Sequence, residues 1–234
     1  MTQMTHSTNS TPSEHEPIVL VRRSEAAGKW RPLICVEFKG APCLYLTAED
    51  WVQCGLQMGM PIPDELYAEL AQRSEVARAL RDALRLLEIR PRFERELSQA
   101  LLRKGWAQES IDGALHRLRE KGLLDDERLV RDRVDAWAGT RSRREIRAKL
   151  RSRGAPAELV NQFVAACVDT EQEREAAVKF AEKYFRRAAG RTSDVDERRA
   201  VAHLVRKGFS LSVARQAVQE AARRYGEQGR NEWA

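Results

Sequence analysis

The sequence predicts a mostly α-helical protein, with tandem three-helix repeats in a curved array behind a small N-terminal domain that contains β-strands. Three observations support this fold class. The 234 residues are 32% charged and only 6% aromatic, a balance typical of helical proteins with wide solvated faces. Short segments rich in β-branched residues are confined to the first fifty positions. A cationic stretch that ends in glycine recurs three times in the rest of the chain.

The N-terminal part is predicted to be a disordered tail followed by a small domain. Residues 1–16 are polar and lack the apolar core of a signal peptide, so we expect no fixed structure there. Residues 17–74 should hold a three-stranded antiparallel sheet covered by helices, because such a sheet is not stable alone. Thr47, with Asp50 three residues later, predicts a capping box at the start of the first of these helices. The expected strands are 18–23, 30–38 and 43–46.

The repeats follow from the spacing of apolar residues around three glycines. Leucine lies four residues before each of Gly105, Gly154 and Gly208, and apolar residues lie eight before, six after and ten after each glycine. Spacings of four are helical, and a glycine after a cationic turn ends a helix in the left-handed conformation. Another amphipathic helix precedes each pair, at 76–88, 126–138 and 175–188. We therefore predict three-helix repeats at 75–125, 126–170 and 171–228.

The charge is unevenly distributed. Residues 1–75 carry 6 Lys and Arg against 10 Asp and Glu, whereas residues 76–234 carry 35 against 25. A basic region of this kind favours an acidic or phosphate-rich partner, although the excess can also serve only solubility. The four cysteines form no CxxC pair, which indicates reduced thiols in a cytoplasmic protein. No apolar run approaches the length of a membrane span.

Short motifs follow one another in a fixed order through the first repeat and into the second. They are Arg90-Pro91-Arg92, then Glu96-Leu97 through Lys104-Gly105, then Leu118 through Gly122-Leu123-Leu124-Asp125-Asp126. In order and number these motifs resemble the RecX family of regulators of the RecA recombinase. The resemblance covers roughly residues 76–225. It continues through residues 142–156, which resemble the family's second-repeat motif with its leading glycine displaced to Gly139. The preceding segment is similar to an N-terminal extension of longer members.

The resemblance implies a non-enzymatic protein that binds the RecA filament on single-stranded DNA. It implies modulation of recombinase activity, with inhibition as the expected direction, in DNA repair, recombination and the SOS response. We expect a cytoplasmic monomer without a cofactor, catalytic residue or metal, and DNA is a further candidate partner. The alternatives are a general basic helical DNA-binding protein that contacts no recombinase and, more remotely, a nuclease. Asp125 and Asp126 are better explained as caps of the following helix than as metal ligands.

The candidate binding residues are cations of the second and third repeats. Residues 141–153 contain seven cations and one acid, with Arg143, Arg147 and Arg151 one helical turn apart on a flank. We expect these three arginines to contact the filament and to be replaceable without damage to the fold; the alternative is a merely solvated face. The full set is Arg141, Arg143, Arg144, Arg147, Lys149, Arg151, Arg153, Arg186, Arg187, Arg206 and Lys207. Trp106 and Phe209, which follow two of the glycines, are predicted to be core.

Overall fold

The computed structural model describes residues 18–25, 33–187 and 193–231. It divides into two compact units, one formed by Met1–Leu86 with Gly105–Ala114 and the other by Leu87–Lys104 with Leu115–Ala234. The tail predicted at residues 1–16 and the first residues of the strand predicted at 30–38 lie outside the described residues.

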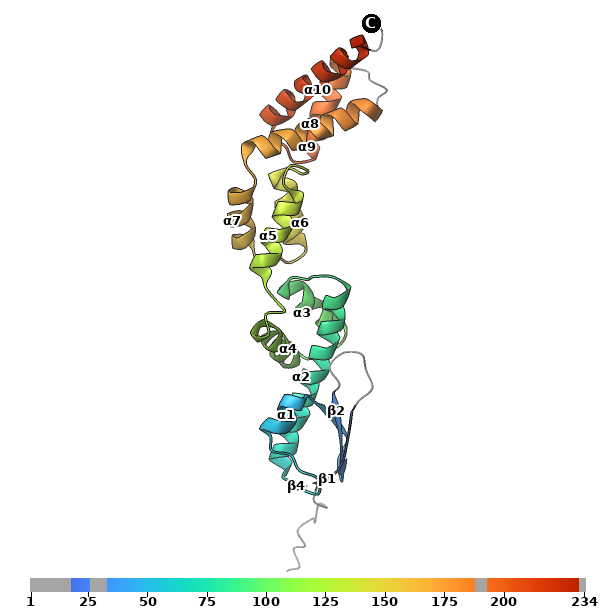
Figure 1. Ribbon diagram of the computed structural model, residues 1–234, viewed down its shortest axis with the longest axis vertical. Helices are drawn as coiled ribbons and strands as arrows, with labels where there is room; N and C mark the ends of the chain where they lie inside the picture. Colours follow the sequence, from blue (N-terminus) through green and yellow to red (C-terminus); the bar gives the residue numbers. More distant parts are fainter. Residues whose placement is uncertain (1–17, 26–32, 188–192, 232–234) are drawn as a thin grey trace, which may run out of the picture. The chain divides into compact units, whose positions relative to one another are not determined.

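An antiparallel sheet of four strands opens the first unit (Figure 1). Its strands, in the order β3-β2-β1-β4, are β1 (Ile18–Glu25), β2 (Ile34–Lys39), β3 (Leu44–Leu46) and β4 (Pro61–Ile62). The prediction of three strands is therefore wrong by one, because Ile62 pairs with Ile18 along the free side of β1. A two-residue strand is too short to show an alternating pattern in the sequence. Its first residue is a proline, which sheets tolerate only at an edge.

Two helices close the apolar face of this sheet. Helix α1 (Ala48–Gln53) begins with the predicted capping box, in which Asp50 N donates to Thr47 Oγ1 (3.1 Å) and Thr47 N donates to Asp50 Oδ2 (3.2 Å). Helix α2 (Asp64–Ile89) contributes Leu70 to the same core. That core also contains buried strand residues, among them Leu20, Val36 and Leu46.

Helix α2 is longer than the sequence pattern suggested. It runs for 26 residues and passes without a break through the boundary that we expected between residues 74 and 75. No glycine or proline interrupts Asp64–Ile89, so nothing in the chain ends the helix there. The first half of α2 therefore covers the sheet, and its second half is the first helix of the first repeat.

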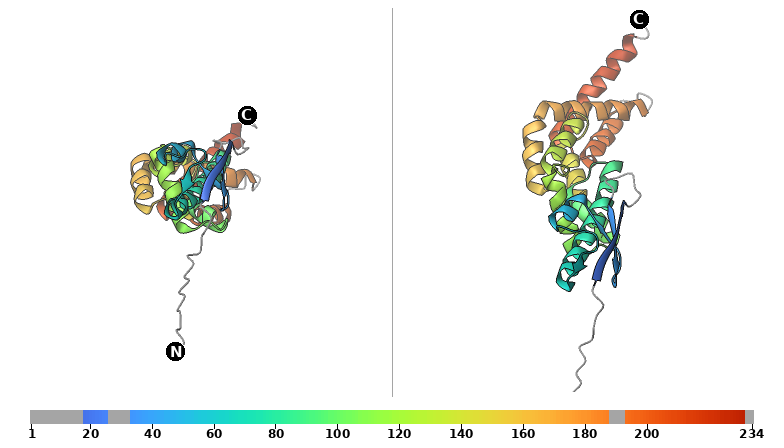
Figure 2. Two further views of the ribbon diagram at one scale, coloured as in Figure 1. Left: turned by 90° about the horizontal axis from the view of Figure 1, so that it is seen from below. Right: turned by 60° about the horizontal axis from the view of Figure 1, so that its bottom comes forward.

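Helices make up the rest of the described chain (Figures 1 and 2). The glycines Gly105, Gly154 and Gly208 follow the middle helices of the three trios, with φ values of 89°, 93° and 94°. The leucine four residues before each glycine is fully buried. Both findings confirm the predicted helix stops. The helices are α3 (Glu94–Arg103), α4 (Gln108–Glu120), α5 (Asp126–Trp137), α6 (Arg143–Ser152), α7 (Ala157–Cys167), α8 (Thr170–Arg187), α9 (Asp194–Arg206) and α10 (Leu211–Asn231).

The second and third trios each have a separate apolar core. Val134, Ile146 and Val164 belong to the core of α5, α6 and α7, and α10 packs on both α8 and α9 around a second cluster that includes Phe209. The burial of Phe209 confirms its predicted core position. Trp106 is only half-buried, which corrects its prediction: its indole Nε1 donates to Asp82 Oδ2 (3.2 Å) near the surface.

Candidate functional site

The second and third repeats meet where α6 begins. Ser142 caps α6 by accepting a hydrogen bond from Glu145 N (3.1 Å), and its own hydroxyl donates to the Lys207 carbonyl at the end of α9 (2.8 Å). A Cβ atom on Gly208 would lie 2.8 Å from Ser142 Oγ, so glycine is needed there for space as well as for its positive φ. We call this contact, residues 142–145 against 207–208, the second joint.

Arg143 ties the second joint to α8. Its backbone N donates to Glu173 Oε1 (3.1 Å), and its side-chain Nε donates to the Val168 carbonyl (2.8 Å). The same Nε lies 3.6 Å from Glu173 Oε2. These contacts argue against the expectation that Arg143 can be replaced without structural cost, because its side chain serves the Val168 carbonyl and lies beside Glu173, which would keep only the backbone N–H of residue 143.

A matching contact joins the first and second repeats within the same unit. A Cβ atom on Gly154 would lie 3.2 Å from Arg95 Cβ and 3.3 Å from Glu96 N, at the start of α3. Glu94 N donates to Asp126 Oδ1 (2.9 Å), just as Arg143 N donates to Glu173. Asp126 therefore has a packing role beside the cap that Asp125 provides by accepting from Arg128 N (2.8 Å). We call residues 93–96 against 153–154 the first joint.

At the first joint three arginines share one carboxylate. Glu96, whose side chain is 14% exposed, accepts hydrogen bonds from Arg90 and Arg92 and lies 3.6 Å from Arg153. Burial by itself raises the pKa of Glu96, but the hydrogen bond and charge of Arg90, with the charges of Arg153 and Arg92, lower this pKa below its ordinary value overall. The cations of this joint thus have an internal partner, with Arg92 and Arg153 largely buried and Arg90 41% exposed.

The second joint leaves its cations facing a groove. Glu145 takes the place of Glu96 and accepts from Arg141 (2.6 Å) as Glu96 does from Arg92. Lys207 takes the place of Arg153, yet no ion pair of Lys207 occurs within the described residues. A groove of about 550 Å³ opens instead, and we call it the joint groove. It is lined by Arg144, Glu145, Ala148, Val205, Arg206, Lys207 and Gly208.

The structure distributes the predicted cations among different environments. Arg144, Arg206 and Lys207 come together at the joint groove, although they belong to two separate sequence clusters. Within the second repeat, Arg141 and Lys149 pair with Glu145, and Arg151 donates to Asn161 Oδ1 (2.8 Å). Arg143 and Arg153 instead have partners in the neighbouring repeats. Arg187 lines another pocket, Arg147 is half-buried and Arg186 is exposed. Their roles in binding stay predictions.

Four lining residues of that other pocket, Phe180, Lys183, Tyr184 and His203, are not among the binding residues predicted from the sequence. The first three lie on α8 with Arg187, opposite His203 of α9 and Lys207 at its C-terminal end. Positions 180, 183, 184 and 187 have the spacing of a single helix face. Because two of the four residues on this face are basic and two are aromatic, the periodicity alone carried a signal for a binding surface.

Two segments of the chain match models of the RecX family. Residues 79–118 match its first three-helix domain, and residues 171–218 match its third. The regulatory protein RecX of Streptomyces coelicolor is 34% identical over 159 residues, which cover 65% of this chain and 81% of that protein. The chain belongs to the RecX family. The RecX regulatory protein of Geobacillus kaustophilus is 32% identical over 188 residues, which cover 77% of this chain and 68% of the relative.

Solved RecX structures have the same fold. A crystal structure of a regulatory protein RecX matches 87% of this chain and 99% of its own length, with a TM-score of 0.70 and 22% identity. RecX from Lactobacillus salivarius matches 63% of this chain with a TM-score of 0.55. In the part of this RecX-family chain that the structure describes, no helix is long and apolar enough to cross a membrane. The same part holds no group of three or more His, Cys, Asp or Glu side chains arranged as metal ligands.

Proposed function

We propose that this chain is a non-enzymatic regulator that binds the RecA–DNA filament in the cytoplasm. It lowers recombinase activity there and so acts in DNA repair, recombination and the SOS response. Membership of a family of regulatory proteins supports the regulatory role. The observation that carries the choice of surface is the joint groove, where Arg144 of one repeat and Arg206 and Lys207 of the next face one cavity.

The groove suits a partner that presents phosphates or carboxylates. Its cations are set on two helices that the Ser142–Lys207 hydrogen bond holds together. Since Arg144, Arg206 and Lys207 make no ion pair within the described residues, binding an anion there breaks no such internal contact. Complementary charge of this kind speeds association and selects the partner, and its effect weakens as salt increases.

A general DNA-binding function is the second candidate. The surplus of 35 Lys and Arg over 25 Asp and Glu in residues 76–234 favours it, because non-specific binding to DNA depends mainly on cations that neutralise phosphates. The two functions differ in what they do to a recombinase. A general DNA binder competes for bare strands, whereas a filament regulator acts on strands that the recombinase already covers.

The test compares two charge-matched double variants in a recombinase ATPase assay on single-stranded DNA. Arg144→Gln with Arg206→Gln removes two groove cations. Arg95→Gln with Arg103→Gln removes their counterparts on α3, since Arg95 occupies the place of Arg144 and Arg103 ends α3 as Arg206 ends α9. The groove variant should need about tenfold more protein for half-inhibition, because two partly exposed contacts contribute about 0.7 kcal/mol each.

The control should inhibit as the wild-type protein does. Equal inhibition by both variants would remove the joint groove from the proposal. A wild-type protein that binds bare DNA tightly but leaves the ATPase of preformed filaments unchanged would favour the general DNA binder. Circular dichroism of both variants checks that each remains folded.

A further inference from the structure

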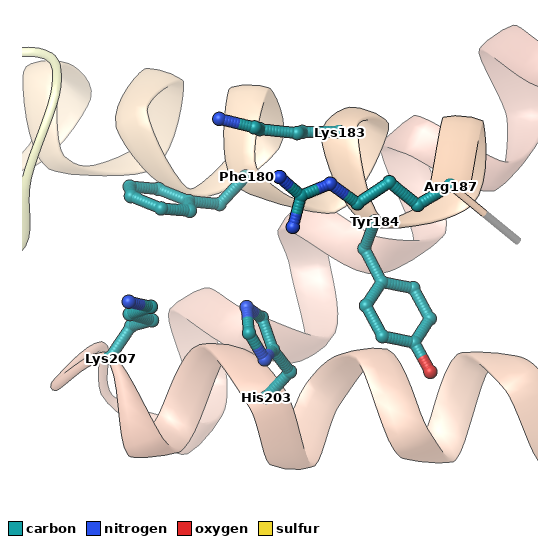
Figure 3. A pocket seen from close by; sticks show the side chains of 6 residues that line it. All are labelled: Phe180, Lys183, Tyr184, Arg187, His203 and Lys207. Atoms are coloured by element: carbon teal, nitrogen blue, oxygen red, sulfur yellow. The ribbon is translucent and has the colours of Figure 1, made fainter.

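A second cavity lies between α8 and α9, on the third repeat (Figure 3). Its volume is about 540 Å³. Phe180, Tyr184 and Arg187 extend from α8 toward this space, and His203 rises from α9 to meet them. Lys183 and Lys207 complete the lining. The cavity thus combines three cationic side chains with three rings.

The cations of this cavity have no ion pair within the described part of the chain, and the acids of the third repeat explain why. Glu182, next to Lys183, accepts from Arg224 of α10 (2.8 Å). Glu220 accepts from Arg174 and Arg224. These carboxylates are paired with arginines where α8 meets α10. The positive charge of Lys183, Arg187 and Lys207 therefore remains for an external anion.

The rings make the cavity different from a simple cationic patch. The rings of Tyr184 and His203 have centroids 5.7 Å apart and are tilted by 38°. The rings of Phe180 and Phe209 meet edge-on with centroids 5.8 Å apart, which fixes the Phe180 ring against the core. Phe180, Tyr184 and His203 are each only half-buried. Aromatic groups held at a surface beside cations are the feature with which proteins bind the bases and phosphates of single strands.

We propose that this cavity binds a nucleotide of single-stranded DNA. Lys183, Arg187 and Lys207 hold the phosphates on either side, and the base stacks against Tyr184 and His203. An acidic peptide would use the cations but not the rings, and a duplex keeps its base faces inside the stack, so a single strand fits both features. The inference goes beyond the filament regulator proposed above because it requires direct binding to bare DNA without a recombinase.

His203 provides a reporter inside the cavity. Burial is the main cause that lowers the pKa of His203, and the charges of Lys207, Arg206 and Arg187 lower this pKa further. The cationic groups that face it are Lys183 and Arg187 of α8, Arg206 of α9 and Lys207, which follows α9. A phosphate bound among these cations would offset their repulsion of the imidazolium form. The pKa of His203 should therefore rise when an oligonucleotide binds, and NMR titration of the full-length protein measures this rise.

The binding test uses the full-length protein, a fluorescent oligothymidylate and no recombinase. Lys183→Gln with Arg187→Gln removes two cavity cations, and Arg198→Gln with Arg215→Gln removes two exposed cations from the neighbouring α9–α10 pocket as a control. Two lost phosphate contacts should reduce the slope of log affinity against log salt by about 1.4. Tyr184→Leu should weaken binding about tenfold through lost stacking. Lys207 stays unchanged in these variants because it also lines the joint groove.

The inference would be overturned if the control variant lost as much affinity as the cavity variant. It would also be overturned if the oligonucleotide left the pKa of His203 unchanged. A third contradicting result is a duplex that binds as tightly as the single strand, together with a folded Tyr184→Leu variant that binds as the wild-type protein does. If Tyr184→Leu does not fold, the lysine–arginine variant and the His203 titration still decide the question. A protein that inhibits recombinase ATPase normally while the cavity fails these tests would overturn this inference alone. If the variant with Arg144→Gln and Arg206→Gln inhibits the recombinase as the wild-type protein does, only the proposal for the joint groove is contradicted.

Discussion

At the first joint Arg153 lies 3.6 Å from Glu96, and at the second joint Lys207 stands in the position of Arg153 beside Glu145, the counterpart of Glu96. Both joints place a left-handed glycine against the start of a middle helix, and both use a carboxylate from the next repeat to accept the first backbone N–H of that helix. The difference lies in the side chains. Arginine can reach across and pair with the carboxylate, whereas Lys207 makes no ion pair within the described residues.

The two joints have similar residues but different roles: both hold neighbouring repeats together, and the second also presents cations to a groove. The backbone contacts and the glycines hold neighbouring repeats together at both joints. At the first joint Arg90, Arg92 and Arg153 are all paired with Glu96, so these cations are mainly structural. At the second joint the cations border a groove, so the same packing presents a charged surface. Repeats with the same three-helix plan can therefore differ in function through a few side chains at their contacts.

The largest effect is expected when alanine replaces each of the three glycines. A Cβ atom on Gly105 would meet no heavy atom within 4 Å, one on Gly154 would meet Glu96 N at 3.3 Å, and one on Gly208 would meet Ser142 Oγ at 2.8 Å. All three have similar positive φ values, so the conformational cost should be about 1 kcal/mol each. Gly208→Ala should lose about 2 kcal/mol more than Gly105→Ala because it also overfills the second joint. Urea denaturation measures the free energy of unfolding.

Gly105→Ala serves as the matched control, because it has the strained φ without the close contact. The loss of unfolding free energy in Gly154→Ala should lie between the losses in the other two variants. Equal losses at all three glycines would mean that the close approach at the joints contributes nothing to stability.

A smaller effect is expected from Glu96→Gln, which tests the ion pairs of the first joint. The folded-state pKa of Glu96 is lowered, so its ionised form stabilises the fold above the unfolded-state pKa, and this contribution is lost as pH falls through the folded-state pKa. Glu96→Gln should lose about 2 kcal/mol at neutral pH, between the values for exposed and buried pairs. Its stability should then fall less on acidification than that of the wild-type protein. Parallel pH profiles for the two proteins would contradict this account.

The repeats could be predicted from the sequence because their signals are local. A leucine four residues before a glycine, with further apolar residues at helical spacing, identifies a helix and its end wherever the helix packs. The buried leucines and positive φ values confirm these assignments. The fourth strand and the unbroken α2 were missed for a related reason. Pro61 and Ile62 form a strand only through their pairing with β1, and no local signal marks where α2 changes from covering the sheet to joining the repeats.

The candidate surface was predicted only in part, because charge counts do not reveal pairing. Residues 141–153 form the densest cationic run, yet Arg143 and Arg153 make contacts between repeats. Arg144 and Lys207 are far apart in sequence, and only the packing of α6 against the end of α9 brings them to one groove. Sequence spacing can place cations on a helix face. It cannot show which of them meet a carboxylate from another repeat.

The smallest effect is expected from a pair of single substitutions at equivalent positions, Arg153→Gln and Lys207→Gln. Arg153 contacts Glu96, donates to the Pro91 carbonyl and covers the Phe93 ring at 5.8 Å, so its loss should cost about 1 kcal/mol of unfolding free energy. Lys207 is exposed, so its substitution should change stability by less than about 0.5 kcal/mol. Thermal melting of the two variants under the same conditions measures the difference. A Lys207→Gln protein as destabilised as Arg153→Gln would show that Lys207 supports the second joint as Arg153 supports the first, and the contrast between the joints would disappear.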